Sequence, residues 1–222
     1  MQDVCMNHIG GPADFIAAFG VSRETLARLE TYAGLLERWQ KTINLVAPGS
    51  MPDLWHRHFA DSAQLLALAP GGPLRWLDLG TGGGFPGLVI ACMLAERPGS
   101  QLTLIESDGR KCAFLREVVR QTGLSAFVAV DIITDRVENG ANTTRVGTVD
   151  VISARALAPL ERLLGWCEPF FGSGTCAVLP KGKDVQVELT AARQVWLFES
   201  SLVTSLTSAD GRILSVRKLA RI

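Results

Sequence analysis

The chain has 222 residues, of which 47% are hydrophobic and 20% are charged. This composition suits one globular unit with a sizeable core, and it excludes an intrinsically disordered protein. Lys and Arg together number 22, and so do Asp and Glu. This balance disfavours nucleic-acid binding driven by overall charge and leaves room only for a local basic patch.

A membrane span is not expected either. Apolar runs such as residues 166–171 are interrupted, here by Glu168 and Pro169, and none reaches the ~18 residues that a span requires. The first twelve residues lack the basic and then apolar pattern of a signal segment. We therefore expect a soluble, cytoplasmic protein.

Cysteine and histidine form no metal-binding pattern in the sequence. Five cysteines are scattered without a Cys-x-x-Cys pair: Cys5, Cys92, Cys112, Cys167 and Cys176. His56 and His58 lie close together but have no third ligand nearby. We expect neither a disulfide framework nor a bound metal.

The first 70 residues have a helical pattern. Apolar residues recur three and four positions apart at Leu29, Tyr32, Leu36, Trp39, Ile43 and Val46. This spacing predicts one amphipathic helix, with Ser22 as its N-cap. A second helix is predicted from near Ser50, with Pro52 in its first turn, to a point before Pro70.

The period changes after the Pro-Gly-Gly-Pro segment at 70–73. Short apolar runs alternate with helix-length segments, at residues 74–79, 101–106, 126–130, 148–153 and 175–179. Such alternation predicts βα units and a parallel sheet that is covered on both faces. Two further strand-like runs, 197–205 and 212–219, are joined by a segment containing Asp-Gly, which is a hairpin signal.

The predicted fold is therefore an α/β, Rossmann-like, doubly wound fold. It has a seven-stranded, mostly parallel sheet that ends in an antiparallel hairpin, and helices precede it. We expect residues 1–70 to form an N-terminal helical extension packed on a core domain of residues 71–222.

The most informative segment lies at residues 76–90, where a buried strand runs into five glycines and then an apolar helix. The glycines are Gly80, Gly82, Gly83, Gly84 and Gly87. Glycines at the carboxyl end of a first strand let the backbone approach a ligand closely, with helix-start amides facing it. This pattern favours a nucleotide or nucleoside site over a tight turn without a ligand.

Two kinds of ligand fit the loop. Residues 82–87 satisfy the Gly-x-Gly-x-x-Gly spacing of dinucleotide sites, and Glu106 ends the next strand, where a carboxylate accepts hydrogen bonds from ribose hydroxyls. NAD enzymes and S-adenosylmethionine (SAM) enzymes share that geometry. Asp78, two residues before Gly80, and the terminal hairpin make the chain similar to class I SAM-dependent methyltransferases.

Five segments carry a more specific resemblance, and they occur at residues 57–62, 80–87, 136–138, 152–156 and 179–182. In their order and spacing the chain resembles the ribosomal RNA small subunit methyltransferase G (RsmG) family, from about Leu26 to the C-terminus. The resemblance implies that SAM is the cofactor and that a guanine of 16S rRNA is methylated at N7.

The resemblance also implies SAM contacts at Gly80, Phe85, Val137, Glu138 and Arg155, with Gly82 and Gly84 in the same loop. This sequence has Ile-Ser-Ala-Arg-Ala at 152–156 where the family has a simpler Ile-Ser-Arg-Ala, so Arg155 is matched on the arginine. From class I geometry we add Asp78 as a ligand of the methionine end and Glu106 as a ligand of the ribose.

The expected chemistry is compatible with the residues present. Guanine N7 carries a lone pair and no proton, so the enzyme must align donor and acceptor but needs no general base. The sequence has no Asn-Pro-Pro-Tyr segment for amine methylation, and no predicted strand ends in a Pro-Cys or Thr-Cys pair for attack at pyrimidine C5. We therefore expect no catalytic base, and we expect His58 and Asp61 to shape the site or fix the N-terminal helices.

For the RNA partner, 16S rRNA or the small-subunit particle, we expect contacts from Arg155 and the substrate-binding Lys181 and Lys183. Three alternatives stay open on sequence alone. They are a SAM-dependent methyltransferase of small molecules, an NAD(H)-dependent oxidoreductase, and a SAM-binding module without catalysis.

Overall fold

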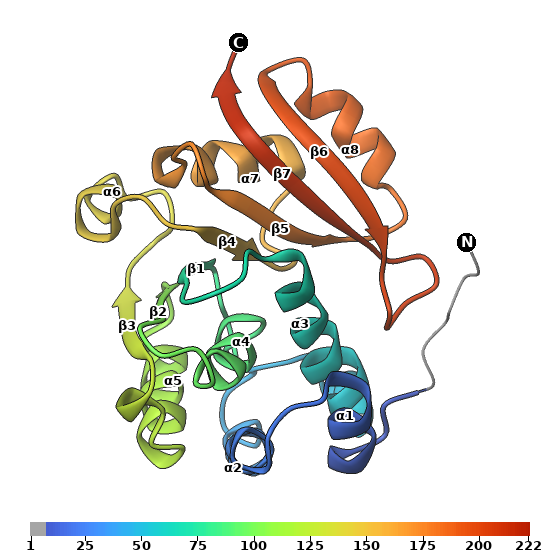
Figure 1. The fold of residues 1–222 in the computed structure, drawn as a ribbon, viewed down its shortest axis with the longest axis vertical. Helices are drawn as coiled ribbons and strands as arrows, with labels where there is room; N and C mark the ends of the chain where they lie inside the picture. Colours follow the sequence, from blue (N-terminus) through green and yellow to red (C-terminus); the bar gives the residue numbers. More distant parts are fainter. Residues whose placement is uncertain (1–7) are drawn as a thin grey trace.

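The computed structural model describes residues 8–222, so Cys5 and the start of the chain lie outside the described residues. Seven strands form one sheet in the order β3-β2-β1-β4-β5-β7-β6 (Figure 1). They are β1 (Arg75–Leu79), β2 (Gln101–Glu106), β3 (Ala129–Thr134), β4 (Val151–Ala154), β5 (Cys176–Lys181), β6 (Trp196–Thr204) and β7 (Arg212–Arg221). The first five strands are parallel, and β7 is antiparallel to both β5 and β6. The predicted fold class is confirmed.

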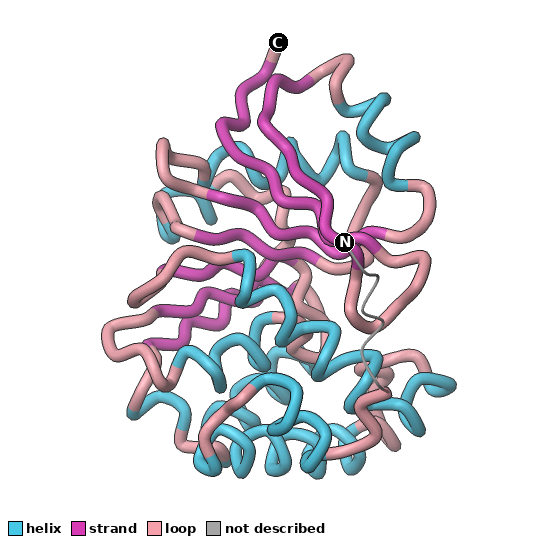
Figure 2. The backbone as a smooth tube through the Cα atoms, turned by 45° about the vertical axis from the view of Figure 1, so that its right-hand side comes forward, coloured by secondary structure: helices cyan, strands magenta, loops and turns pink. Residues whose placement is uncertain are grey.

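Helices cover both faces of this sheet (Figure 2). The α-helices are α1 (Pro12–Phe19), α2 (Arg23–Trp39), α3 (Asp61–Ala63), α4 (Gly87–Leu94), α5 (Gly109–Gln121), α6 (Ala141–Val146), α7 (Leu160–Cys167) and α8 (Val185–Ala192). Short 3-10 or π turns are η1 (Pro48–Asp53), η2 (Trp55–Ala60), η3 (Gln64–Leu68), η4 (Leu124–Ala126) and η5 (Glu168–Phe170). Among residues 8–222, no helix is long and apolar enough to cross a membrane.

The two faces of the sheet bury different helices. On β1, Trp76 packs in the cluster that contains α1, α2, α4 and α5, whereas Leu77 packs in the cluster that contains α7 and α8. This division follows from the alternation of side chains along a strand. Phe15, Leu29 and Phe59 are completely buried in the first cluster. The early helices therefore share a continuous core with α4 and α5, and the boundary at residue 70 stays a prediction.

The predicted first helix is confirmed with Ser22 as its N-cap, but α2 ends at Trp39 and does not continue to Val46. The Gln40 side chain ends it by accepting hydrogen bonds from the Leu45 and Val46 amides and donating one to the Val46 carbonyl. These bonds satisfy the backbone without a further helical turn. Val46 remains buried even though it lies outside the helix.

Three other elements differ from the prediction. Helix α1 was not anticipated, and the predicted second helix is a chain of short irregular turns from Pro48 to Leu68. The third strand lies at Ala129–Thr134, whereas the run at 126–130 was expected to form it. Since β3 is an edge strand and only Ile133 is fully buried in it, apolar composition marks this strand poorly.

The back of the glycine loop is packed against the N-terminal helices. Tyr32 of α2 donates a hydrogen bond to the Gly83 carbonyl and stacks on Phe85, with ring centroids 5.2 Å apart. Gly84 has φ of +96°, and a Cβ there would lie 2.6 Å from the Tyr32 hydroxyl and 2.7 Å from Leu88. The loop has its shape because glycine allows this close approach.

We predict that Gly84→Ala destabilises the protein by about 1–3 kcal/mol, because the added methyl overpacks the interior and the backbone is left-handed. Thermal unfolding should show a melting temperature lower by roughly 3–10 °C. Gly71→Ala is the matched control, since nothing lies within 4 Å of its Cβ position. Equal melting temperatures for the two variants would contradict this account of the loop.

Candidate functional site

A cleft of about 430 Å³ opens where the first three parallel strands end. Leu79 pairs with Ile105 and Ile105 pairs with Ile133, so the loops after β1, β2 and β3 meet at one edge of the sheet. Residues that line the cleft are Gly80, Gly82, Glu106, Ser107, Lys111, Asp135, Arg136, Val137, Glu138, Leu157, Arg162 and Trp166. In open α/β sheets this edge is where ligands bind.

The glycine loop forms one wall of this cleft. Gly80 and Gly82 have φ of +64° and +60°, which favours glycine at both positions. A Cβ on Gly82 would meet only the Gly80 carbonyl oxygen, at 4.0 Å, whereas a Cβ on Gly80 would lie 2.4 Å from Leu157 Cδ1. A side chain at Gly80 would therefore displace Leu157 in the β4–α7 loop.

Glu106 is a nearly buried carboxylate of the cleft, with 8% of its surface exposed. Its Oε2 accepts a hydrogen bond from the Gly82 amide at 2.9 Å, and its Oε1 accepts one from the Asp108 amide at 2.8 Å. Each oxygen keeps a further lone pair for a ligand. The carboxylate is thus held rigidly against the glycine loop.

The loop after β3 brings Val137 and Glu138 to the cleft. Glu138 lies 3.7 Å from Arg136 and 3.6 Å from Arg162, and the Arg162 guanidinium lies 4.9 Å from the centre of the Trp166 ring. Leu157, Arg162 and Trp166 were not predicted. The only sequence signal for the wall that α7 contributes was an Arg and a Trp spaced four residues apart on one helix.

Asp78, Gly84 and Phe85 do not line the cleft but lie behind the loop. Asp78 is completely buried, and its carboxylate accepts hydrogen bonds from Ser153 Oγ at 2.7 Å and from the Gly87 amide at 3.0 Å. Burial raises the pKa of Asp78 to about 6, against these hydrogen bonds, which lower it. Asp78 fixes the start of α4 onto β1 and β4, while no oxygen of it reaches the cleft.

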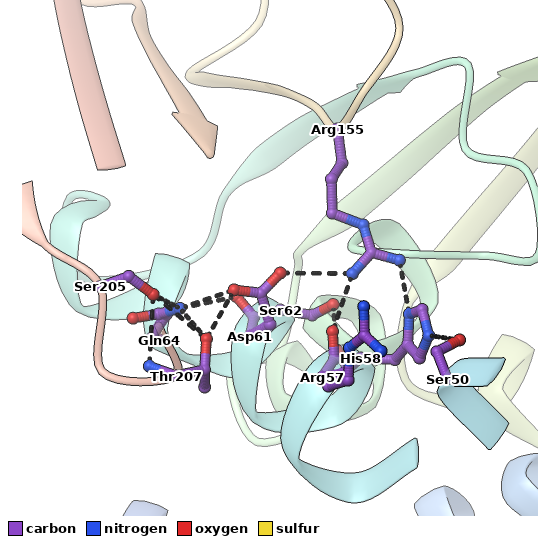
Figure 3. A network of polar contacts seen from close by, with 9 residues as sticks. All are labelled: Ser50, Arg57, His58, Asp61, Ser62, Gln64, Arg155, Ser205 and Thr207. Atoms are coloured by element: carbon purple, nitrogen blue, oxygen red, sulfur yellow. Dashed lines mark hydrogen bonds and ion pairs between the residues drawn. The ribbon is translucent and has the colours of Figure 1, made fainter. Parts of the chain in front are cut away.

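Arg155 follows β4, and its side chain lies in a polar network (Figure 3). Its guanidinium donates to Asp61 Oδ2 and to the Arg57 carbonyl, both at 3.2 Å, and to His58 Nδ1 at 2.8 Å. Burial, followed by the charges of Arg155 and Arg57, lowers the pKa of His58 to about 3. His58 is therefore neutral at pH 7, and because Nδ1 accepts from Arg155, its Nε2 donates to Ser50 Oγ at 2.7 Å.

The same network holds the β6–β7 turn. Thr207 donates to Asp61 Oδ1 at 2.8 Å, and Gln64 donates to Ser205 Oγ at 3.1 Å and accepts from the Leu206 amide at 2.8 Å. Asp61 thus joins the β4–α7 loop to the terminal hairpin (Figure 3). His58 and Asp61 are both engaged in positioning other groups.

A second cavity, of about 370 Å³, lies beside the cleft between the β4–α7 loop, the end of β5 and the β6–β7 turn. Leu157 lines both spaces, and Arg155 and Lys181 line only the second. The Lys181 side chain is 8% exposed and lies 2.7 Å from Glu188, whereas Lys183 is exposed and lines neither space. The structure thus brings Arg155 and Lys181 to one cavity but separates Lys183 from it.

We predict that Asp78→Asn changes how stability depends on pH. Because the pKa of Asp78 is about 6 in the folded chain and 3.8 is its ordinary value, the folded chain binds this proton first as the pH falls. Wild-type stability relative to Asp78→Asn should therefore increase by about 2 kcal/mol from pH 6 to pH 4. Denaturant unfolding of the two proteins at pH 6 and pH 4 measures the change, and an equal difference at both pH values would contradict it.

Comparison with known proteins places this chain in a family. The family model described as rRNA small subunit methyltransferase G (GidB) matches residues 25–217. The chain is 53% identical over 215 residues to the ribosomal RNA small subunit methyltransferase G of Parvibaculum lavamentivorans, covering 95% of this chain and 92% of that protein. It is 47% identical over 206 residues to the protein of the same name from a Bradyrhizobium strain, covering 93% and 90%.

Solved structures agree on the fold. A methyltransferase from Geobacter sulfurreducens superposes with a TM-score of 0.57 at 15% identity, covering 85% of this chain and 90% of that one. Aeropyrum pernix fibrillarin in complex with natively bound S-adenosyl-L-methionine gives 0.53 at 14% identity, covering 71% and 76%. With the family model spanning most of its length and close relatives at about half identity, the chain belongs to the ribosomal RNA small subunit methyltransferase G family.

Proposed function

We propose that this chain is a SAM-dependent methyltransferase that methylates a guanine of 16S rRNA at N7. Membership of the family supports the reaction and the RNA substrate, since the relatives carry that name. The observation that carries the proposal within the structure is Glu106. It is a nearly buried carboxylate fixed by the Gly82 amide in a cleft at the carboxyl edge of the sheet.

The residues of the cleft fit the cofactor. Glu106 retains lone pairs that can accept hydrogen bonds from ribose hydroxyls, and Gly80 and Gly82 offer backbone without side chains. Val137 and Trp166 supply apolar surface for a purine ring. We propose that these residues, with Glu138 at the rim, hold SAM, and that Asp78, Gly84 and Phe85 support the loop from behind.

When bound, SAM supplies a methyl group on a positively charged sulfur, which a lone pair can attack directly. The chain's own task is to hold both partners in line and to exclude water. Guanine N7 has no proton to lose, so no side chain must remove one. Consistent with this, the His58 Nδ1 is occupied by Arg155, and Asp61 is paired with the same arginine.

The NAD(H) alternative loses support from the loop geometry. In a dinucleotide site, the second glycine of the Gly-x-Gly-x-x-Gly pattern lets the backbone approach the pyrophosphate, and the third allows close packing of the helix on the strand. Here a Cβ on Gly84 would meet Tyr32 and Leu88, and a Cβ on Gly87 would lie 2.4 Å from Leu104 and 2.8 Å from Asp78. Gly87 packs against the strand as the third glycine of a dinucleotide site also would. Gly84, in the second position, faces the protein interior and not a ligand, and this is the observation against a dinucleotide.

For the RNA surface, we propose that Lys183 contacts phosphate at the rim and that Arg155 and Lys181 face the second cavity. A chain with no net charge must rely on such local contacts and on RNA shape. We further propose that the partner is 16S rRNA, free or within the small-subunit particle, and that the protein acts in the cytoplasm, where ribosomes are made.

The proposed reaction is tested by locating the transferred methyl group. Purified protein, labelled SAM and small-subunit RNA or particles lacking the modification should give 7-methylguanine at one position, detected by cleavage chemistry selective for that base. Label on another atom, or none on RNA, would contradict the proposal.

We predict that Gly80→Val abolishes SAM binding while the protein stays folded. The new side chain collides with Leu157 at the cleft wall, and the left-handed backbone disfavours a branched residue. Calorimetry with SAM measures the effect. Gly71→Val serves as the control because its Cβ position is open, and normal affinity in Gly80→Val would remove the loop from the site.

We predict that Glu106→Gln weakens SAM binding by about 1–3 kcal/mol, which is roughly a 5- to 150-fold higher dissociation constant. The amide nitrogen of glutamine cannot accept from the Gly82 or Asp108 amides, and the charge that strengthens bonds to hydroxyls is lost. Glu199→Gln is the control, because Glu199 is an exposed residue of β6, and this variant should bind SAM normally. An unchanged dissociation constant for Glu106→Gln would exclude a ribose contact.

A further inference from the structure

The cavity beside the cofactor cleft is the place to look for the target base; we call it the acceptor cavity. Leu157 lines both spaces, so the two are neighbours across one side chain. Leu163, Pro180 and Ile213 give the acceptor cavity apolar walls. Enzymes that modify a base take it out of its stack into such a pocket and read its Watson–Crick edge by hydrogen bonds.

The acceptor cavity contains a partly buried ion pair. Lys181 Nζ lies 2.7 Å from Glu188 Oε2, and the two side chains are 8% and 28% exposed. Removing a charged pair from water is costly, and such a pair gives little net stability compared with apolar residues. Its presence in the wall of a cavity therefore calls for a functional reason.

The pair has hydrogen-bonding capacity that the fold does not use. Glu188 Oε2 accepts from Lys181 Nζ and from the Leu160 amide, both at 2.7 Å. Within residues 8–222, Glu188 Oε1 accepts no hydrogen bond and the Lys181 ammonium makes only one. The pair can thus offer a donor and an acceptor, side by side, to a molecule in the cavity.

A donor beside an acceptor complements guanine when the donor lies on the N7 side of the base. Its O6 accepts a hydrogen bond and the adjacent N1–H donates one, whereas adenine has a donor at N6 and an acceptor at N1. O6 also lies next to N7, so a group that holds O6 positions N7. Resting on the proposed function, we propose that Lys181 donates to O6 and Glu188 accepts from N1–H of the target guanine, and thereby select guanine.

Substituted RNAs test this reading directly. The guanosine that the wild-type protein methylates is first mapped and is then replaced, in small-subunit particles reconstituted from ligated 16S rRNA, by inosine or by 2-aminopurine riboside. Inosine keeps O6 and N1–H but lacks the 2-amino group, whereas 2-aminopurine keeps N7 and the 2-amino group but lacks O6 and N1–H. Initial rates of methyl incorporation are compared.

We expect inosine to be methylated within about threefold of guanosine and 2-aminopurine to be slower by at least about tenfold. With N7 held at the methyl donor, Lys181 would face the C6–H and Glu188 the N1 lone pair of 2-aminopurine, so that both are left unpaired. Lys181→Met and Glu188→Gln should reduce the guanosine rate and bring the guanosine to 2-aminopurine ratio toward one. A purely structural role would lower the rates but leave this ratio unchanged.

Lys218 and Glu199 provide the matched control, since they form a Lys–Glu pair at 2.6 Å that is 70% and 60% exposed. Lys218→Met and Glu199→Gln should keep both the rates and the ratio. If Lys181→Met does not fold, two measurements still test whether the pair selects guanine. They are the Glu188→Gln variant, whose side-chain oxygen can still accept from the Leu160 amide, and the comparison of guanosine with 2-aminopurine in the wild-type protein.

The possible failures are distinguishable. If the wild-type protein methylates no guanine N7, the proposed function is wrong before any substituted RNA is made. If it methylates guanosine and 2-aminopurine equally well, or if the two variants keep the wild-type ratio, the proposed function stands and this inference is overturned.

Discussion

The buried carboxylate of Asp78 is the contact on which the site depends. It lies on the first strand, accepts a hydrogen bond from Ser153 on β4 and accepts another from the amide that begins α4. Trp76 Nε1 donates to the same serine hydroxyl at 2.8 Å. Two strands and a helix start are thereby joined at the point where the strand order reverses, and the glycine loop has a fixed path from β1 to α4.

Sequence spacing predicted which strand ends meet but not which side of the loop each residue faces. Gly82 and Glu106 line the cleft because parallel strands end at one edge, and Val137, which only the family resemblance indicated, lines it from the loop after β3. Asp78 and Phe85 come from the same segments, yet burial places them behind the loop. The wall contributed by α7 escaped prediction because a crossover helix reaches the cleft only through tertiary packing, which a single sequence does not encode locally.

The fold itself could be predicted further than the site. After residue 70 the spacing of apolar residues changes from helical to strand-like, and an Asp-Gly pair marks the turn near the end. Both signals depend only on residues close together in the sequence, so they can be recognised without the tertiary structure. The predicted elements were wrong where a single side chain or the position of a strand in the sheet overrides the pattern of apolar residues. Gln40 ends α2 by satisfying the next backbone amides itself, and β3 at the sheet edge has little need of apolar residues.

Two buried groups that lie behind the glycine loop, His58 against Phe85 and Asp78 at the start of α4, have opposite effects on stability in acid. The pKa of His58 is about 3 in the folded chain and 6.5 is its ordinary value. Between these pH values only the unfolded chain binds the proton, so acid lowers the free energy of unfolding there. Asp78 takes its proton in the folded chain below about pH 6, so acid raises the free energy of unfolding. Where the two ranges overlap, between about pH 6 and pH 3.8, the two effects on the free energy of unfolding offset one another.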